Sequence, residues 1–329
     1  MSQPVDPRLR VADLFVFRGR RGTVLALTTD RSAVGGLASG ATYDLRIDGD
    51  GDAVEDLTYR VVVDGADPAD GTRPVVLRRL SGADAEDPAA CGTVVAAGRT
   101  GSTVAGTDGL RLWTGTAADP APVDPGLLAA VTTAVEHGTP VDLSGRVLPA
   151  APPTGNRVAA VVLEIPDAVL APVAMRAAGR IGVWATVAPA AGQGGPQTHR
   201  RGLPLVGEVL AGLDAPLREH LGRGRPAADR AEFGGMFAKK AEQVVAAGAA
   251  VGDPRAYARR VADRLLPDVL PYTIGTTASF GFAGWNGRDP ADDAAGVVCS
   301  VVTGVAVPFG AGRATAHRAT TTWPYLPLL

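Results

Sequence analysis

The sequence predicts a mainly β protein of the α+β class, with a sandwich-like antiparallel β body and a helical insertion. Three observations support this prediction. Short runs of alternating or β-branched residues, separated by Gly- and Asp-bearing turns, follow one another through the first hundred residues. Helical spacing of apolar residues dominates between 205 and 266. Strand and helix do not alternate regularly along the chain, so a doubly wound parallel sheet is not expected.

The expected strands begin with a hairpin, because residues 18–22 carry two glycines between two apolar runs. The clearest alternation follows, with Tyr43, Leu45 and Ile47 on one face. In chain order, the sequence predicts strands at Asp13–Phe17, Thr23–Thr28, Thr42–Ile47, Leu57–Val63, Pro74–Leu80, Thr93–Ala97, Leu110–Thr114, Val158–Ile165, Ile181–Val187 and Gly296–Val307.

Two helices have the same starting signal, an Asp-Pro pair at 124–125 and at 253–254. The Asp can cap free amides, and proline at the first helical position loses no hydrogen bond. We expect the first helix to end at Gly138 and the second at Pro267. A further helix is expected at Ala228–Ala247, which carries aromatic and aliphatic residues at helical spacing.

The bulk composition excludes several classes of protein. With 329 residues, of which 46% are hydrophobic, the chain can bury a sizeable core. Lys and Arg number 32 and Asp and Glu 34, so the net charge of −2 is not that of a nucleic-acid binder. The apolar runs are shorter than the ~18 residues of a membrane span, and no signal-peptide pattern is seen. We therefore expect a cytoplasmic protein without nucleic-acid or membrane partners.

The two cysteines, Cys91 and Cys299, are too few for a disulfide framework or a Cys-rich metal site. We expect two buried thiols, with one long-range disulfide as the alternative. Pro149–Gly155 is rich in Pro and Ala and is expected to be a loop or linker.

The most distinctive local pattern is the acidic run between the third and fourth expected strands. Asp48, Asp50 and Asp52 alternate with small residues, as at the first, third and fifth positions of a calcium-binding EF-hand loop. The match then ends, because alanine and tyrosine stand where such a loop has its glycine and its bidentate glutamate. Two interpretations stay open. One is a Ca²⁺ site with Asp48, Asp50, Asp52 and Asp56 as ligands, and the other is a hairpin loop with Asp and Gly turn chemistry.

A second group of carboxylates surrounds an arginine late in the chain. Arg288 lies near Asp292 and Asp293, and Asp268 precedes them in an apolar segment. Carboxylates with different degrees of burial can divide into a general acid and a general base. The alternative is that they cap the element that follows, and the position of Asp293 before an apolar run favours capping.

Eight segments carry a resemblance to a known family. They read DLFVFRG, YDLRIDGDGDAVEDLTYRVVV, VVLEIPDAVL, IGVWATV, HRRGLPLVGEVL, LLPDVLPY, NGRDPADDAAGVVCSVVTG and WPYLPLL, in this order. The chain resembles the bacterial domain-of-unknown-function (DUF) 4331 family over nearly its whole length. The resemblance implies a single unit, residues 1–329, with a helical insertion at about 205–266. The family-like polar positions are Asp13, Asp48, Asp50, Asp52, Glu55, Asp56, Arg99, Asp268, Arg288, Asp292 and Asp293.

The resemblance implies no reaction. The chain also departs from the family pattern, because residues 1–10 contain no histidine and 119–124 contain no phenylalanine. These departures indicate a divergent, intracellular branch.

Two hypotheses for function follow. In the first, the protein is a cofactor-independent enzyme of the lyase, cyclase or hydrolase type. Its substrate would be a small apolar metabolite in a cleft between the β body and the helical insertion, polarised by Asp268, Arg288 or Asp292. In the second, it is a non-catalytic binding or scaffold protein whose acidic loop is structural, with or without Ca²⁺. The sequence leaves the oligomeric state open.

Overall fold

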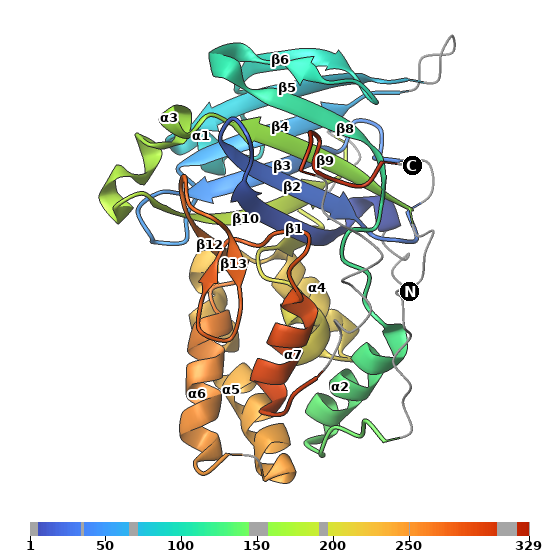
Figure 1. Ribbon diagram of the computed structural model, residues 1–329, viewed down its shortest axis with the longest axis vertical. Helices are drawn as coiled ribbons and strands as arrows, with labels where there is room; N and C mark the ends of the chain where they lie inside the picture. The colour runs from blue at the N-terminus through green and yellow to red at the C-terminus, as the bar shows by residue number, and fades with distance from the viewer. Residues whose placement is uncertain are drawn as a thin grey trace.

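The computed structural model describes residues 6–33, 36–65, 72–144, 157–190, 197–249, 251–307 and 321–328. Two antiparallel sheets form the upper part of the molecule in Figure 1, and the longer helices lie below them. The predicted fold class, a β-rich α+β sandwich, is confirmed. The expected linker Pro149–Gly155 lies outside the described residues.

The first sheet has five strands. Its hairpin forms as predicted, with the Gly19 amide donating to the Gly22 carbonyl at 2.7 Å. In spatial order the strands are β1 (Val11–Arg18), β2 (Thr23–Thr29), β9 (Arg157–Ile165), β8 (Arg111–Ala118) and β7 (Val104–Ala105).

The second sheet is larger and is built around the long strand β10 (Arg180–Ala188). Beyond β10 follow β3 (Thr42–Asp48), β4 (Leu57–Val63), β5 (Pro74–Ser81) and β6 (Thr93–Arg99). The other edge of β10 is divided between two short strands. β11 (His199–Arg201) pairs with its second half and β12 (Leu270–Thr273) with its first half. The chain between these two strands is the predicted helical insertion, so both of its ends are hydrogen-bonded to one edge of the sheet.

Side-chain alternation explains why the sheets pack face to face. On β1, Leu14 and Val16 enter the main core, which they share with Leu45 and Ile47 of β3. The intervening Phe15 and Phe17 point to the other side of the sheet. There the C-terminal segment covers them, and its buried members are Tyr325 and Leu326.

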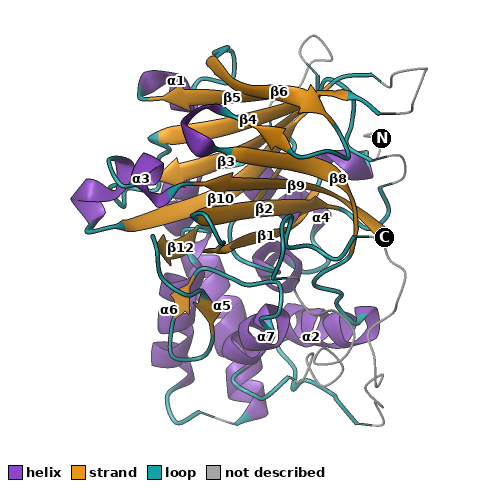
Figure 2. Cartoon of the chain, turned by 45° about the horizontal axis from the view of Figure 1, so that its top comes forward, coloured by secondary structure: helices purple, strands orange, loops and turns teal. Residues whose placement is uncertain are grey.

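The helical insertion consists of a π-helical turn η4 (Gly207–Ala211) and the helices α4 (Ala215–Arg223), α5 (Asp229–Gly248) and α6 (Pro254–Leu265), with a short turn η5 (Pro226–Ala228). Asp253 caps α6 as predicted, accepting from the Ala256 amide at 2.9 Å. Phe233 and Phe237 of α5 are buried and stack on each other. α2 (Pro125–His137), capped by Asp124, packs against the same group, as Figure 2 also shows.

One predicted strand is wrong. Residues 294–303 form the helix α7 (Ala294–Thr303), and Gly296–Val307 contains no strand. All ten residues of α7 are buried, so the helix is apolar on every side and shows no amphipathic period. A short, continuous run of Val cannot be assigned to helix or strand by periodicity alone. The capping carboxylate of Asp293 and the helices that surround the run decide for the helix.

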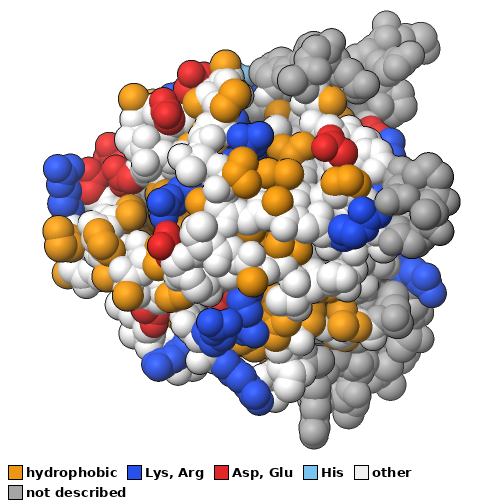
Figure 3. Space-filling view, turned by 90° about the horizontal axis from the view of Figure 1, so that it is seen from above, with side chains coloured by type: hydrophobic (Ala, Val, Ile, Leu, Met, Phe, Trp, Pro, Cys, Tyr) orange, Lys and Arg blue, Asp and Glu red, His pale blue; other side chains and the backbone are white. Residues whose placement is uncertain are grey.

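The remaining elements are short. They are η1 (Pro7–Leu9), α1 (Ala83–Glu86), η2 (Thr107–Gly109), α3 (Asp167–Leu170), η3 (Val173–Ala177), β13 (Ser279–Phe280) and β14 (Trp285–Asn286). Among the described residues, no helix combines the length and the apolarity that a membrane span requires. On the face shown in Figure 3, basic, acidic and apolar side chains are interspersed in small groups.

Both cysteines are free, so the disulfide alternative is wrong. Cys299 of α7 is buried as expected, whereas Cys91 is exposed, which corrects the second half of the prediction. Cys91 lies in the turn before the edge strand β6, whereas Cys299 lies in the fully buried helix α7.

Candidate functional site

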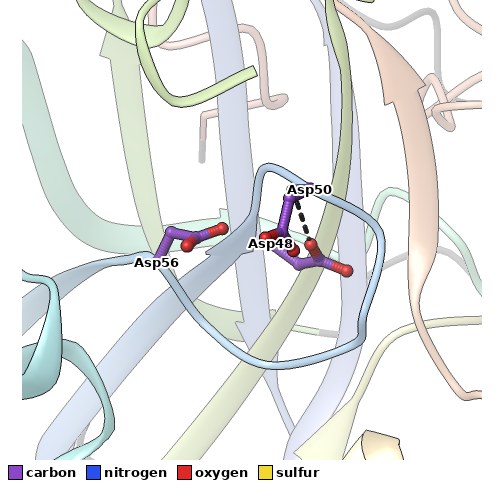
Figure 4. A group of neighbouring side chains, drawn as sticks. All are labelled: Asp48, Asp50 and Asp56. Atoms are coloured by element: carbon purple, nitrogen blue, oxygen red, sulfur yellow. Dashed lines mark hydrogen bonds between the residues drawn. The ribbon is translucent and has the colours of Figure 1, made fainter. Parts of the chain in front are cut away.

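The acidic loop connects β3 and β4, and three of its four predicted ligands come together. Asp48, Asp50 and Asp56 each place one carboxylate oxygen within 4.8 Å of the others (Figure 4). Asp52 is not part of this group. Asp48 is buried with 3% of its surface exposed, and burial raises the pKa of its carboxyl group.

These carboxylates are already hydrogen-bonded to the loop itself. Asp48 accepts from the amides of Asp50 and Gly51 through one oxygen and of Ala53 through the other. Asp56 accepts from the Gly49 amide at 2.7 Å. Such bonds from a side chain to nearby amides define a polar turn, which is the second of the two interpretations of the loop.

The loop backbone has one EF-hand feature. Ala53 has a φ of 64°, the left-handed conformation that a glycine adopts most easily at the sharp turn of a calcium loop. The loop is also held from outside, because a Cβ on Gly49 would lie 2.3 Å from the Val173 carbonyl oxygen of η3. The acidic loop is therefore a rigid wall against which other segments pack.

Next to this wall lies a cleft of 490 Å³ between the β body and the helical insertion. We call it the arginine cleft. Its polar lining consists of Asp48, Arg180, Arg230, Asp263, Arg264 and Trp285, and its apolar lining includes Ile181, Leu266, Pro267, Val269 and Pro271. A substrate cleft was expected between the β body and the insertion, but none of its expected residues Asp268, Arg288 and Asp292 lines this one, whereas Asp48, expected as a metal ligand, does.

The three arginines of the cleft come from three elements. Arg180 begins β10, Arg230 lies in α5 and Arg264 in α6. Arg230 donates to the Leu266 carbonyl, and Arg264 donates to the carbonyls of Gly281 and Phe282. Among the described residues, none of the three forms an ion pair with a carboxylate, so their positive charge is not neutralised by a partner.

Trp285 provides an aromatic surface in the same cleft. The Arg264 guanidinium lies 4.3 Å from its ring centroid, and Phe280 stacks on the ring at 4.8 Å. Its indole nitrogen is buried and has no hydrogen-bond partner among the described residues. Burial lowers the pKa of Arg264, although nearby Tyr257 acts in the opposite direction.

The three residues predicted as catalytic do not line the arginine cleft. Asp292 accepts from the Asp289 amide and closes a turn before α7. Asp268 accepts from the Leu203 amide at 2.6 Å. Arg288 is 1% exposed, lies over the Phe15 ring and donates to Asp13.

Asp268 and Arg288 instead belong to a buried group of charges beneath β1 and β11. Burial raises the pKa of Asp268, an effect that Arg200 and Arg201 partly oppose. Burial also opposes ionisation of Asp13, but Arg288, Arg31 and Arg201 hold its pKa below the usual value. These contacts connect the β body to the insertion. Asp292 is not part of this buried group and instead accepts from the Asp289 amide in the turn before α7.

Sequence reasoning missed the residues of the arginine cleft. Arg230 and Arg264 lie on helices that were predicted, but nothing in the helical pattern shows which exposed arginine faces a cleft. The sequence signal nearest to the cleft is the Asn-Gly-Arg segment at 286–288, which directly follows the cleft residue Trp285.

No family model, curated protein or solved structure matches this chain, so the resemblance to the DUF 4331 family stays a prediction.

Proposed function

We propose that this protein binds a small amphipathic organic anion in the arginine cleft. The observation that carries the proposal is the combination of three arginines without carboxylate partners and a lining that is otherwise largely apolar. A guanidinium group pairs well with carboxylate, sulfonate or phosphate oxygens, often through two parallel hydrogen bonds.

The shape of the cleft suits such a ligand. Its volume of 490 Å³ falls in the range of about 300–1,000 Å³ that is typical of small-molecule sites. The apolar side chains of the lining, among them Ile181, Leu266 and Val269, favour an apolar body. The anionic group would lie toward Arg180 and Arg264.

Of the two hypotheses from the sequence, the binding protein is the better supported. The expected catalytic residues Asp268, Arg288 and Asp292 are engaged outside the cleft. Within the cleft, the carboxylate of Asp48 is hydrogen-bonded to three loop amides. The acidic loop then serves as a structural wall of the binding site, without a bound ion.

The test is titration with 8-anilinonaphthalene-1-sulfonate, a fluorescent aromatic anion, and its displacement by 2-naphthoate. We expect saturable binding at one site and displacement by 2-naphthoate but not by the neutral 2-naphthamide. R264Q and R180Q should each weaken binding about tenfold, because a hydrogen bond to a charged group contributes about 1.5–3 kcal/mol.

R218Q is the matched control, since Arg218 is an exposed arginine of α4 away from the cleft. Thermal unfolding of each variant checks that the fold is intact, because the dye also binds partly unfolded chains. Equal affinity in the native protein, R264Q and R180Q would refute the proposal, as would the absence of saturable binding.

A further inference from the structure

A second, smaller pocket lies apart from the arginine cleft and shares no lining residue with it. We call it the histidine pocket. Its volume is 160 Å³, and its charged and polar lining consists of Arg10, Asp13, Asp30, Arg31, His199, Arg201 and Glu208. These residues come from β1 and the residue before it, the turn after β2, β11 and η4, so the pocket lies where the first sheet meets the insertion.

Two segments singled out in the sequence meet here. His199, Arg201 and Glu208 all belong to HRRGLPLVGEVL, and Asp13 begins DLFVFRG. Neither segment contributes to the arginine cleft, and neither has a role in the proposed function.

The carboxylates of the pocket all have partners within the protein: Asp13 is buried, Glu208 is partly exposed, and Asp30 accepts from the Ser32 amide and hydroxyl. Glu208 receives two hydrogen bonds from Arg201, one to each oxygen. Asp13 receives a hydrogen bond of 2.7 Å from Arg288 and lies 3.6 Å from Arg31 through its other oxygen. Arg31 is also bound to Asp119. These acceptors therefore have their partners within the protein.

Two side-chain nitrogen atoms of the pocket, in contrast, have no partner among the described residues. Arg201 is 5% exposed, and its Nε has no hydrogen-bond partner in the part of the chain that the structure describes. An arginine Nε is always a donor. The Nδ1 atom of His199 is also buried without a partner. Arg10 adds an exposed positive charge to the lining. Buried polar groups normally have partners, and these two nitrogens have none among the described residues, which points to a ligand in the pocket.

We propose that the histidine pocket binds a small monocarboxylate, whose oxygens accept hydrogen bonds from Arg201 Nε and His199 Nδ1. This requires the histidine tautomer that carries its proton on Nδ1. The volume equals that of about five water molecules at about 30 Å³ each, which limits the ligand to the size of acetate or lactate. Water is the competing occupant, and it accepts hydrogen bonds equally from both nitrogens but carries no charge for Arg10 to attract.

The test uses acetate, and acetamide as a neutral molecule of the same size. Side-chain ¹H–¹⁵N spectra of the full chain report the histidine ring nitrogens directly. The variants H137Q, H220Q and H317Q each remove one histidine signal, so the remaining one is assigned to His199 without altering the pocket. Sodium chloride keeps the ionic strength constant.

We expect acetate to shift the His199 ring signals saturably in the millimolar range, and acetamide to shift them at least fivefold less. His137 and His220 should not respond, because both are exposed and away from the pocket. R10Q should weaken acetate binding about threefold, whereas R18Q, an exposed arginine at the end of β1, should leave it unchanged.

Three results would overturn the proposal. No response of His199 to either compound means that the pocket holds only water. Equal responses to acetate and acetamide refute the carboxylate class. Shifts of all histidines together mean a general salt effect. None of these results bears on dye binding in the arginine cleft, so the two proposals fail separately.

Discussion

At the scale of single residues, Asp48 belongs to a pattern that is typical of a calcium loop, but its carboxylate stabilises the turn itself. Its two carboxylate oxygens accept three amide hydrogen bonds within the loop. An asparagine at this position keeps one acceptor oxygen but turns an NH₂ group toward the Ala53 amide.

We therefore expect D48N to lower the free energy of unfolding by about 1–2 kcal/mol, since a buried amide loses its acceptor. Urea unfolding measures this change. D52N is the matched control and should have little effect, because Asp52 is exposed and uses one oxygen for the Val54 amide.

The same loop predicts the response to calcium. Because both oxygens of Asp48 and one oxygen of Asp56 accept from loop amides, millimolar Ca²⁺ should leave the midpoint of thermal unfolding unchanged, as measured by calorimetry. A calcium-dependent rise that D48N abolishes would instead establish the metal site.

His199 predicts a pH dependence of stability. Burial, followed by the positive charge of Arg201, lowers the pKa of His199 from 6.5 to about 3 in the folded protein. Between these pH values the unfolded chain binds a proton that the folded protein does not, so the free energy of unfolding falls as the pH falls. Burial raises the pKa of Glu208, but the positive charge of Arg201 outweighs this effect and lowers the pKa from 4.5 to about 2. Glu208 therefore reduces the free energy of unfolding only below pH 4.5.

Urea unfolding between pH 7 and pH 5 separates the two groups. Native protein should lose stability over this interval, and H199Q should lose clearly less, because its side chain takes up no proton. Parallel curves for the two proteins would show that His199 is not held neutral. H220Q, which changes an exposed histidine, serves as the control.

At the scale of elements, α7 is the segment where sequence and structure disagree. The Val-rich run after Asp293 resembles a buried strand, but the Asp293 carboxylate accepts from the Gly296 amide at 3.1 Å and starts a helix. The capping alternative for this aspartate is thereby confirmed, and the strand that was expected to follow it is replaced by α7.

D293A should lower the free energy of unfolding by about 1 kcal/mol, which is typical for the loss of an N-cap. D293N should retain most of the stability, because asparagine caps a helix nearly as well. Both values come from urea unfolding. Equal losses for the two variants would indicate that the charge of Asp293, and not its capping bond, is what matters.

At the scale of the whole molecule, the insertion is joined to the β body by a buried ion pair. Arg200 of β11 and Asp229 at the start of α5 are 1% and 0% exposed in their side chains and lie 2.8 Å apart. Asp229 also accepts from the Asp268 amide. One side chain therefore connects β11, α5 and the segment that leads into β12.

R200M should destabilise the protein by about 3–5 kcal/mol, because it leaves the buried Asp229 without its cation. The double variant R200M/D229N should recover part of this loss. R223Q, which breaks an exposed pair with Glu219 in α4, should cost less than about 1 kcal/mol. We expect one cooperative unfolding transition in all variants, as the single unit of residues 1–329 requires. Separate transitions for the body and the insertion would contradict that prediction.

The sequence by itself determined the β-rich class, the strands up to β10 except the two-residue β7, and the helices α2 and α6 with their Asp-Pro starts. These features depend on local properties, namely alternation, turn residues and Asp-Pro starts, that each segment carries alone. It also located the acidic loop and the buried polar positions Asp268 and Arg288.

Only the tertiary structure decided what those positions do. Whether the Val run of α7 becomes helix or strand depends on the helices that enclose it. Whether Asp268 or Arg264 faces a cavity depends on segments far apart in sequence that meet only after β11 and β12 pair with the same edge of β10. A cleft is a relation between distant surfaces, and no local pattern of residues encodes that relation.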